Sequence, residues 1–184
     1  METAWNLARE QGIAALSLRD LARRLGMTAP SLYSYFDSKH ALFDAMFAQG
    51  YEQFLQLEWP DSDDLRDGLR RAGRTFLEFC TADPARYQLL FQRAIPGFAP
   101  SPESWELAQR AYHRSMAGLA RFGVREQRDL DLVTGVFSGL AAQQLANQPG
   151  GSRWAGLVDE AADMLAEHLH ARTTPSQPKN RRQR

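Results

Sequence analysis

A short segment near the start of the chain carries hydroxyl side chains at a spacing that could present them together to a hydrogen-bonding partner. At about 100° per residue, Thr28, Ser31 and Tyr35 fall within about 60° of one another around a helix. A narrow polar face of this kind fits the major groove of DNA. Lys39 follows in the first turn of the next predicted helix, where backbone amides and the helix dipole favour a phosphate. The chemistry indicated is nucleic-acid binding.

Two helices and a turn must position these side chains. We expect a helix over 18–25, because Ser17 can cap its first amides and leucines recur on one face. Gly26 supplies the left-handed residue that ends this helix, and Thr28 can cap the next one, whose first turn tolerates Pro30. The pattern predicts a helix-turn-helix, although an ordinary three-helix packing with a solvated polar face would also produce it.

Three further segments extend this pattern. They read Ala-Trp-Asn-Leu-Ala-Arg-Glu-Gln-Gly at 4–12, Leu-Tyr-Ser-Tyr-Phe-Asp-Ser-Lys at 32–39 and Ala-Leu-Phe-Asp-Ala at 41–45. Together they closely resemble the DNA-binding domain of the TetR/AcrR family of bacterial transcriptional regulators. The resemblance covers about the first 50 residues, and the rest of the chain agrees only in length and helical character.

This resemblance implies roles for individual residues. The arginine that matches Arg19 reaches a base edge or a phosphate in such proteins, and the positions that meet bases match Thr28, Ala29, Pro30 and Ser31. The positions that contact phosphates match Tyr33, Tyr35 and Lys39. The chemistry agrees, because an arginine can fork onto guanine, small apolar groups can meet a thymine methyl, and hydroxyls can bind phosphate or base. For each residue alone, the alternative is a surface side chain that contacts nothing.

Length and charge suggest how the chain is divided. Its 184 residues fit a DNA-binding domain over 1–48 and a helical effector-binding and dimerisation domain over 49–170. The remaining residues, 171–184, carry five cations and no acids, and we expect a disordered basic tail. Residues 1–50 hold five cations and five acids, so DNA affinity must come from placed contacts and should weaken with salt.

The fold is expected to be all-α, because no period-two pattern occurs and amphipathic segments alternate with Gly and Pro turns. Helices are predicted over 2–11, 18–25, 29–36, 39–57, 63–82, 84–94, 102–121, 126–147 and 152–170.

Aromatic and soft side chains are concentrated in the middle of the chain. The resemblance implies a ligand pocket there, and such a lining would suit a small, hydrophobic effector. The candidate lining residues are Phe76, Phe79, Tyr87, Phe91, Trp105, Tyr112, His113, Met116 and Phe137. The alternative for each aromatic residue is a place in the hydrophobic core.

The last two helices carry an apolar face with small residues. In the resembled family the final two helices pair with those of a second subunit in a four-helix bundle, and this composition suits such a homodimer. The candidate interface residues are Leu132, Val136, Leu140, Leu157, Ala161, Met164 and Leu165. The alternative is that these side chains complete the core of one subunit.

Other kinds of site find little support. Cys80 stands alone in an apolar helix and is expected to be a buried structural thiol rather than a redox sensor. The four histidines have no metal-ligand spacing, and no nucleophile or phosphate-loop motif is present, so we expect no metal, no cofactor and no catalytic site. Apolar runs are too short for a membrane span, and we expect a cytoplasmic protein.

The sequence therefore predicts a homodimeric transcriptional regulator rather than an enzyme. We expect a repressor that reads an inverted-repeat operator in double-stranded DNA and is released by a small hydrophobic effector. The competing hypothesis is a helical small-molecule-binding or catalytic protein whose helix-turn-helix does not bind DNA, which the neutral first domain keeps open.

Overall fold

The computed structural model describes residues 1–59 and 61–173, and of Thr173 only the backbone. This part of the chain consists of helices and connecting turns without a strand, so the predicted all-α class is confirmed. The elements are α1 (Glu2–Gln11), η1 (Ile13–Ala15), α2 (Leu18–Arg24), α3 (Ala29–Tyr33), α4 (Lys39–Leu55), α5 (Leu65–Ala82), α6 (Pro84–Phe91), α7 (Pro102–Ala120), α8 (Gln127–Asn147), η2 (Ala155–Leu157) and α9 (Val158–Thr173). The tail expected over 171–184 overlaps α9 at residues 171–173, and its remainder lies outside the described residues.

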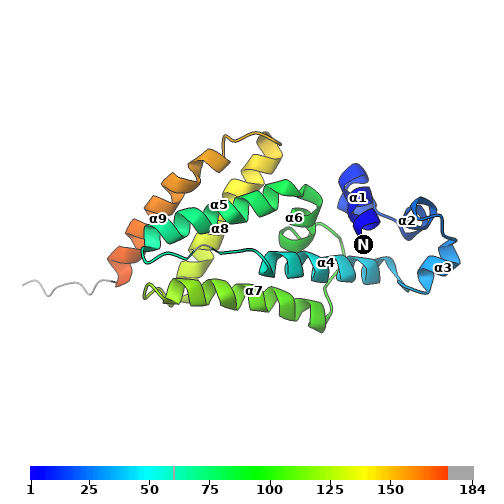
Figure 1. Cartoon of the computed structure of the whole chain (residues 1–184), viewed down its shortest axis with the longest axis horizontal. Helices are drawn as coiled ribbons and strands as arrows, with labels where there is room; N and C mark the ends of the chain where they lie inside the picture. Colours follow the sequence, from blue (N-terminus) through cyan, green and yellow to red (C-terminus); the bar gives the residue numbers. More distant parts are fainter. Residues whose placement is uncertain (60, 174–184) are drawn as a thin grey trace, which may run out of the picture.

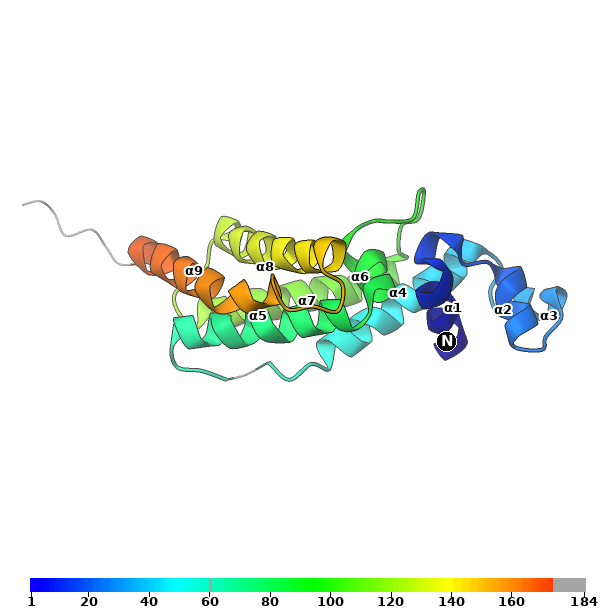
Figure 2. The same ribbon diagram turned by 90° about the horizontal axis from the view of Figure 1, so that it is seen from above.

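The molecule is elongated, with α1, α2 and α3 at one end and α5 to α9 at the other (Figures 1 and 2). Helix α4 runs from the first group into the second and packs against α6 and α7. Helix α5 packs against α8 and α9 at the far end. Any movement of α4 relative to α7 would therefore change how the two ends of the molecule are oriented.

The caps expected around the helix-turn-helix are confirmed. The side-chain oxygens of Ser17 and Thr28 accept hydrogen bonds from the amides of Asp20 and Ser31, at 3.1 and 3.3 Å. Gly26 has φ 67°, a conformation that L side chains rarely adopt, so the chain can leave α2 and turn into α3. These local preferences fix the angle at which α3 is presented.

Helices α3 and α6 both end earlier than the sequence pattern predicts. Helix α3 ends at Tyr33, where the amide of Tyr35 donates to the carbonyl oxygen of Leu32 at 3.0 Å in a tighter, 3₁₀-type turn. Helix α6 ends at Phe91, and Arg93 adopts φ 48°, which is incompatible with a continuing right-handed helix.

The last helix begins later than the sequence pattern predicts. The side chain of Gln144 is buried in α8, and its Oε1 accepts hydrogen bonds from the amides of Trp154 and Ala155, at 2.9 and 3.1 Å. These bonds hold the turn before α9, which starts at Val158 instead of near residue 152. Hydrogen bonds from the turn to a buried amide side chain thus form where the sequence predicts the first residues of the helix.

A glycine allows α5 to approach α8 and α9 closely. A Cβ atom on Gly73 would lie 2.6 Å from Cε1 of Phe137 and 2.8 Å from Cγ1 of Val158. Contacts this short do not occur between real side chains, so a larger residue at Gly73 would push the neighbouring helices apart.

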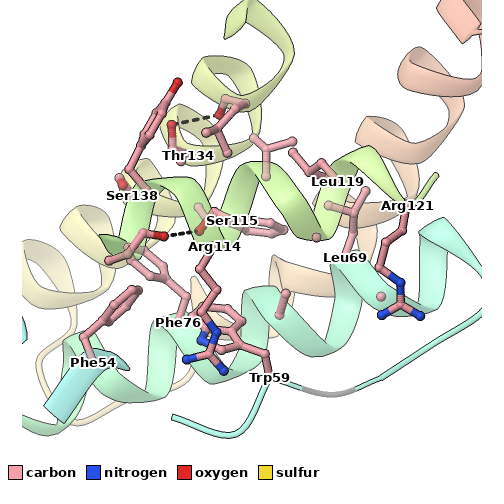
Figure 3. A pocket seen from close by; sticks show the side chains of 18 of the residues that line it. Phe54, Trp59, Leu69, Phe76, Arg114, Ser115, Leu119, Arg121, Thr134 and Ser138 are labelled. Atoms are coloured by element: carbon pink, nitrogen blue, oxygen red, sulfur yellow. Dashed lines mark hydrogen bonds between the residues drawn. The ribbon is translucent and has the colours of Figure 1, made fainter. Parts of the chain in front are cut away.

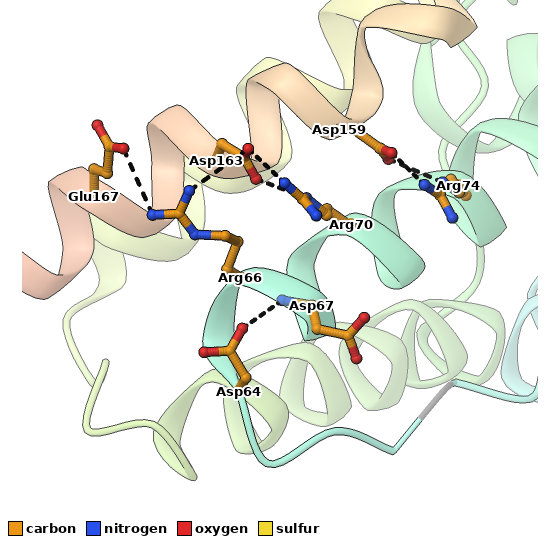
Figure 4. Close-up of polar contacts among 8 residues, drawn as sticks. All are labelled: Asp64, Arg66, Asp67, Arg70, Arg74, Asp159, Asp163 and Glu167. Atoms are coloured by element: carbon orange, nitrogen blue, oxygen red, sulfur yellow. Dashed lines mark hydrogen bonds and ion pairs between the residues drawn. The ribbon is translucent and has the colours of Figure 1, made fainter.

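An ion-pair ladder, defined as Arg66, Arg70 and Arg74 of α5 with Asp159, Asp163 and Glu167 of α9, reinforces the same packing (Figure 4). Its central member is Arg70, whose Nε and Nη2 donate to both carboxylate oxygens of Asp163, at 2.7 and 2.6 Å. The Arg70 hydrogen bond, followed by the charges of Arg70 and Arg66, holds the pKa of Asp163 below its usual range.

The ends of α4 are tied to α7 by polar contacts. The carboxylate of Asp44 accepts hydrogen bonds from the amide of Ser101 at 2.7 Å and from the hydroxyl of Ser104 at 2.9 Å. At the other end, the guanidinium group of Arg114 donates to the carbonyl oxygens of Leu55 and Leu57. Helix α7 is therefore attached to both ends of α4.

Candidate functional site

The polar face of α3 is open to solvent. Tyr33 and Tyr35 are 52% and 73% exposed, whereas Leu32 is 3% exposed and packs into the core. Ser31 is exposed as well, and its hydroxyl lies 2.8 Å from that of Thr28. The side chains expected to meet bases and phosphates therefore share one accessible end of the molecule, while one leucine anchors the short helix.

A hollow beside α3 brings together three of the predicted DNA contacts. Arg19, Tyr33 and Lys39 line it, although they come from three different helices. Its other lining residues are Ser17, Leu18, Asp20, Asp37 and Ser38. A phosphate in this hollow would also meet the N-terminal end of α4, where Ser38 caps the amide of Ala41 at 3.0 Å.

Lys39 has an internal contact that the sequence did not predict. Its Nζ donates to the carbonyl oxygen of Ala14 at 2.8 Å and lies 5.3 Å from the centre of the Phe43 ring. An ammonium group has three donors, so this bond to η1 leaves Lys39 with donors that can reach a phosphate. Lys39 thus links the turn between α1 and α2 to the start of α4.

The acidic residues near this surface are partly neutralised. The Ser17 hydroxyl and then Arg23 hold the pKa of Asp20 below its usual range. Arg23 pairs with Asp20 at 2.6 Å, and Arg24 pairs with Glu10, so neither arginine is an unpaired cation at the surface. Arg19 is exposed and borders the hollow. It is the arginine of α2 best placed to reach DNA.

The second candidate site is a cavity of about 690 Å³ between α5, α7, α8 and the end of α4 (Figure 3). One end is aromatic: the rings of Phe54 and Trp59 lie 5.5 Å apart, and those of Phe76 and Phe91 lie 5.6 Å apart. Burial raises the pKa of Tyr51, which also lines the cavity, to about 12, so its phenol stays neutral. This end would bind a flat or extended apolar group.

The cavity includes only part of the predicted lining. Four candidate residues line it, namely Phe76, Phe91, Tyr112 and Phe137. Five do not, namely Phe79, Tyr87, Trp105, His113 and Met116.

The five that lie elsewhere have other neighbours. Phe79 lies under the guanidinium group of Arg86, at 3.7 Å from its ring centre, and the hydroxyl of Tyr87 donates to the carbonyl oxygen of Ser138 at 3.4 Å. Trp105 is 49% exposed, and His113 is also exposed on α7. Met116 is half-buried against the core.

The polar residues that line the cavity were not predicted, because nothing in their local sequence distinguishes them from other helix residues. Ser115 and Thr134 donate to backbone carbonyls of their own helices, at 3.2 and 2.9 Å, and keep acceptor oxygens beside the cavity. Arg114 of α7 and Arg121, the residue that follows this helix, also line it. These four positions can be assigned only after the helices are packed together.

An apolar strip remains on the outer face of α8 and α9. Leu132, Leu157 and Met164 are 40%, 39% and 59% exposed. The candidate interface residues Val136, Leu140 and Ala161 are half-buried. Leu165 differs from the rest: it is 2% exposed because it packs into the core of the single chain, so it is not available at the surface. The side chains other than Leu165 define the outer strip.

Among the described residues, no group of three or more His, Cys, Asp or Glu could hold a metal ion. No helix in that part of the chain is long and apolar enough to cross a membrane. Cys80 is buried, as expected for a structural thiol, and burial raises the pKa of this thiol.

The short exposed helix α3, held by α2 and a glycine turn, defines a helix-turn-helix protein with a larger helical part that contains a cavity. Residues 1–46 match the sequence profile described as "Bacterial regulatory proteins, tetR family". This match confirms the resemblance of the first residues of the chain to the DNA-binding domain of the TetR/AcrR family of bacterial transcriptional regulators.

Relatives of this chain agree with that assignment. The HTH-type transcriptional regulator Rv1816 of Mycobacterium tuberculosis is 28% identical over 99 residues, which cover 51% of this chain and 42% of that protein. The HTH-type transcriptional repressor Rv1353c of the same organism is 26% identical over 134 residues, which cover 72% and 50% of the two chains. The chain thus spans about half the length of the curated relatives it matches. These relatives are named as regulators, in agreement with the expectation that this chain is not an enzyme.

Solved structures share the fold. A TetR variant from Acinetobacter baumannii in complex with minocycline aligns with a TM-score of 0.65 at 21% identity, covering 94% of this chain and 95% of that one. The similarity therefore extends through the cavity-bearing helices as well as the helix-turn-helix.

Proposed function

We propose that the protein is a homodimeric, ligand-released transcriptional repressor that binds an inverted-repeat operator. Residues 1–48 would form its DNA-binding domain and residues 49–170 its effector-binding and dimerisation domain. The single observation that carries the proposal is the exposed polar face of α3, set beside a hollow lined by Arg19, Tyr33 and Lys39. In a family of transcriptional regulators, such a face is suited to the major groove.

Base recognition would come from Thr28, Ala29, Pro30 and Ser31, together with Arg19. Phosphate contacts would come from Tyr33, Tyr35 and Lys39. Because the first 50 residues hold equal numbers of cations and acids, these few placed contacts would provide the affinity. Operator binding should therefore be sensitive both to salt and to single substitutions on this surface.

Dimerisation would use the outer strip of α8 and α9. Leu132, Leu157 and Met164 expose apolar surface that a second copy could cover, and the half-buried Val136, Leu140 and Ala161 would add to it. A two-fold dimer would place two α3 helices in register with two half-sites. Met164→Asp should then yield a monomer in light scattering, while a dimeric variant would assign these side chains to a surface without a partner.

Effector release would result from a coupling free energy between the cavity and the operator. A molecule that binds more tightly to a dimer with misplaced recognition helices must weaken DNA binding by the same factor that DNA weakens its own binding. A typical coupling of about 1–3 kcal/mol corresponds to roughly 5- to 150-fold release. Because α4 joins the cavity to the first helices, it is the element through which this coupling would act.

The deciding experiment is a DNA-binding titration of the full chain. Fragments from upstream of its own coding sequence, and a random-sequence library, would be tested by fluorescence anisotropy at low and physiological salt with scrambled competitor. We expect saturable, sequence-selective binding that weakens as salt rises. Replacing Arg19 by Ala and Tyr33 by Phe together should weaken it by at least about tenfold, since each specific contact contributes about 1–3 kcal/mol.

The matched control is Arg110→Ala, which removes an exposed arginine on α7, outside both candidate sites. This variant should bind the selected fragment as the unmodified chain does. If no library sequence is selected, the protein is a helical small-molecule-binding protein whose helix-turn-helix does not read DNA, and the proposal is wrong.

A further inference from the structure

We infer that the effector of this cavity is an apolar molecule with a single anionic head group, and that Arg114 is the residue that selects it. The inference rests on the proposed function, because it takes the cavity as the effector site. It adds the charge of the ligand, the side chain that reads this charge and the contact that is broken when the ligand binds.

Arg114 is bonded only to uncharged groups in the described part of the chain. Its Nη1 and Nη2 donate to the carbonyl oxygens of Leu55 and Leu57, at 2.5 and 3.0 Å, and its Cζ lies 6.0 Å from the centre of the Trp59 ring. A guanidinium group has five donors, so several remain for another acceptor. Its charge is offset by carbonyl dipoles and a ring face rather than by a carboxylate.

The other charged groups of the cavity are already paired. Arg121 donates to Asp61 at 2.6 Å, and Asp61 is the only acid among the described residues that line the cavity. The lining therefore carries a net positive charge of one, located on Arg114. A lipophilic cation would find no free carboxylate here, whereas an anion would find a guanidinium group with unused donors.

The apolar part of the ligand has an evident place. Phe54, Trp59 and Phe76 lie on the same side of the cavity as Arg114, and the lining continues to Leu69 and Leu119 at the other end (Figure 3). A carboxylate at Arg114 would thus leave an attached hydrocarbon chain or ring among these side chains. The arrangement fits an amphipathic acid better than a uniformly apolar molecule.

Binding of the head group would also disturb α4 directly. A carboxylate accepts two parallel bonds from a guanidinium group and competes with the neutral carbonyls of Leu55 and Leu57, because charge-assisted bonds are the stronger ones. Withdrawal of Arg114 would release the last turn of α4 while the bonds of Asp44 to α7 stay in place. Ligand binding would then loosen one of the two attachments between α4 and α7.

The test uses three probes that share a hydrocarbon chain and differ in charge: dodecanoate, methyl dodecanoate and dodecyltrimethylammonium. Each would be titrated into the full chain by calorimetry, below its micelle concentration. We expect dodecanoate to bind about tenfold or more tightly than the ester, as one charge-assisted pair implies, and the cation to bind most weakly. Equal affinities for the acid and the ester, or tighter binding of the cation, would overturn the inference.

Arg114→Gln should reduce dodecanoate affinity to that of the ester and leave ester binding unchanged. Arg110→Gln, one turn earlier on the same helix and outside the cavity lining, should keep the preference for the acid. Loss of ester and acid binding together in Arg114→Gln would assign Arg114 to the structure of the cavity and contradict a role in selecting charge. If that variant does not fold, Arg114→Lys keeps the charge and should keep the preference.

Hydrogen exchange gives a second measurement, because dodecanoate should increase exchange in the last turn of α4 and the ester should not. The calorimetry and exchange do not involve DNA. A chain that prefers dodecanoate but selects no DNA sequence would contradict the proposed function alone. A chain that selects DNA but shows no preference among the probes would contradict only this inference.

Discussion

Arg9 of α1 and Asp83, the residue that caps α6, form an ion pair between the two ends of the molecule. The Nε and Nη2 atoms of Arg9 donate to Oδ2 of Asp83, at 3.0 and 2.6 Å, while Oδ1 accepts from the amide of Arg86 at 3.1 Å. Asp83 is 4% exposed, so its carboxylate depends on these partners for solvation. One buried side chain thus starts α6 and holds α1 against it.

We predict that Arg9→Ala lowers the free energy of unfolding by about 1–2 kcal/mol, because it leaves the Asp83 carboxylate with its backbone partner alone. Urea denaturation would measure this. A double-mutant cycle with Asp83→Asn should give a coupling energy of about 1 kcal/mol. Additive effects in the cycle would show that the two side chains do not interact in solution.

Substitutions of Lys39 and of Tyr33 should differ in their effect on stability, although both should weaken DNA binding. Lys39→Met removes the bond to Ala14 and should cost about 1 kcal/mol of stability as well as DNA affinity. Tyr33→Phe removes only a hydroxyl from a half-exposed ring, so it should weaken DNA binding and leave the melting temperature unchanged. Melting curves and anisotropy titrations of both variants test this difference, and a fully stable Lys39→Met would refute the structural role of the lysine.

Gly73→Ala should alter the shape of the cavity, although Gly73 does not line it. The added methyl group would press on Phe137, which lines the cavity, and on Val158, so we expect a loss of about 1–3 kcal/mol in stability and weaker ligand binding. Gly118→Ala is the matched control for stability, because its Cβ atom would meet nothing within 4 Å; Gly118 itself lines the cavity, so this control does not apply to ligand binding. This control should be as stable as the unmodified chain or more so. Similar losses in both variants would contradict the packing argument.

The ion-pair ladder gives a dependence of stability on pH. Because the Arg70 bond lowers the pKa of Asp163 in the folded chain, this carboxylate stabilises the fold above its ordinary pKa of about 4. The contribution should disappear as the pH falls through the lowered pKa. The urea midpoint of Asp163→Asn should therefore lie below that of the unmodified chain at pH 7 and approach it at low pH. A constant difference across this range would be evidence against the ladder.

The thiol of Cys80 should be unreactive in the folded protein. Burial raises the pKa of its thiol, so little thiolate forms and a reagent cannot reach it. Ellman's reagent should react with less than about a tenth of the thiol within minutes under native conditions, and with all of it in denaturant. Rapid reaction of the native protein would restore the hypothesis of a redox sensor.

Local chemistry made the first helices predictable. Ser17, Thr28 and Gly26 each act on their nearest neighbours in sequence, so their cap and turn roles follow from residue type alone. The all-α class follows in the same way from hydrophobic periodicity. The prediction was least accurate where a distant side chain decides the backbone, as Gln144 does at the start of α9.

The cavity could be predicted only in part for a related reason. An aromatic residue in a helix has the same signature whether it packs in the core or faces a ligand, and Phe79 and Phe76 illustrate the two outcomes three residues apart. Arg114 gave no signal because its partners, Leu55 and Leu57, lie on another helix and its following turn. Side chains that act across helices become visible only in the packed structure.

Helix α4 is continuous from Lys39 to Leu55, and Asp44 and Leu55 near its two ends are bonded to α7. A hybrid regulator built by fusing residues 1–48 to a foreign effector domain would cut this helix in the middle. The carboxylate of Asp44 would then lose the hydrogen bonds that it accepts from Ser101 and Ser104. The unit that recombination or design can exchange intact is therefore larger than the helix-turn-helix, and its natural boundary includes α4 together with α7.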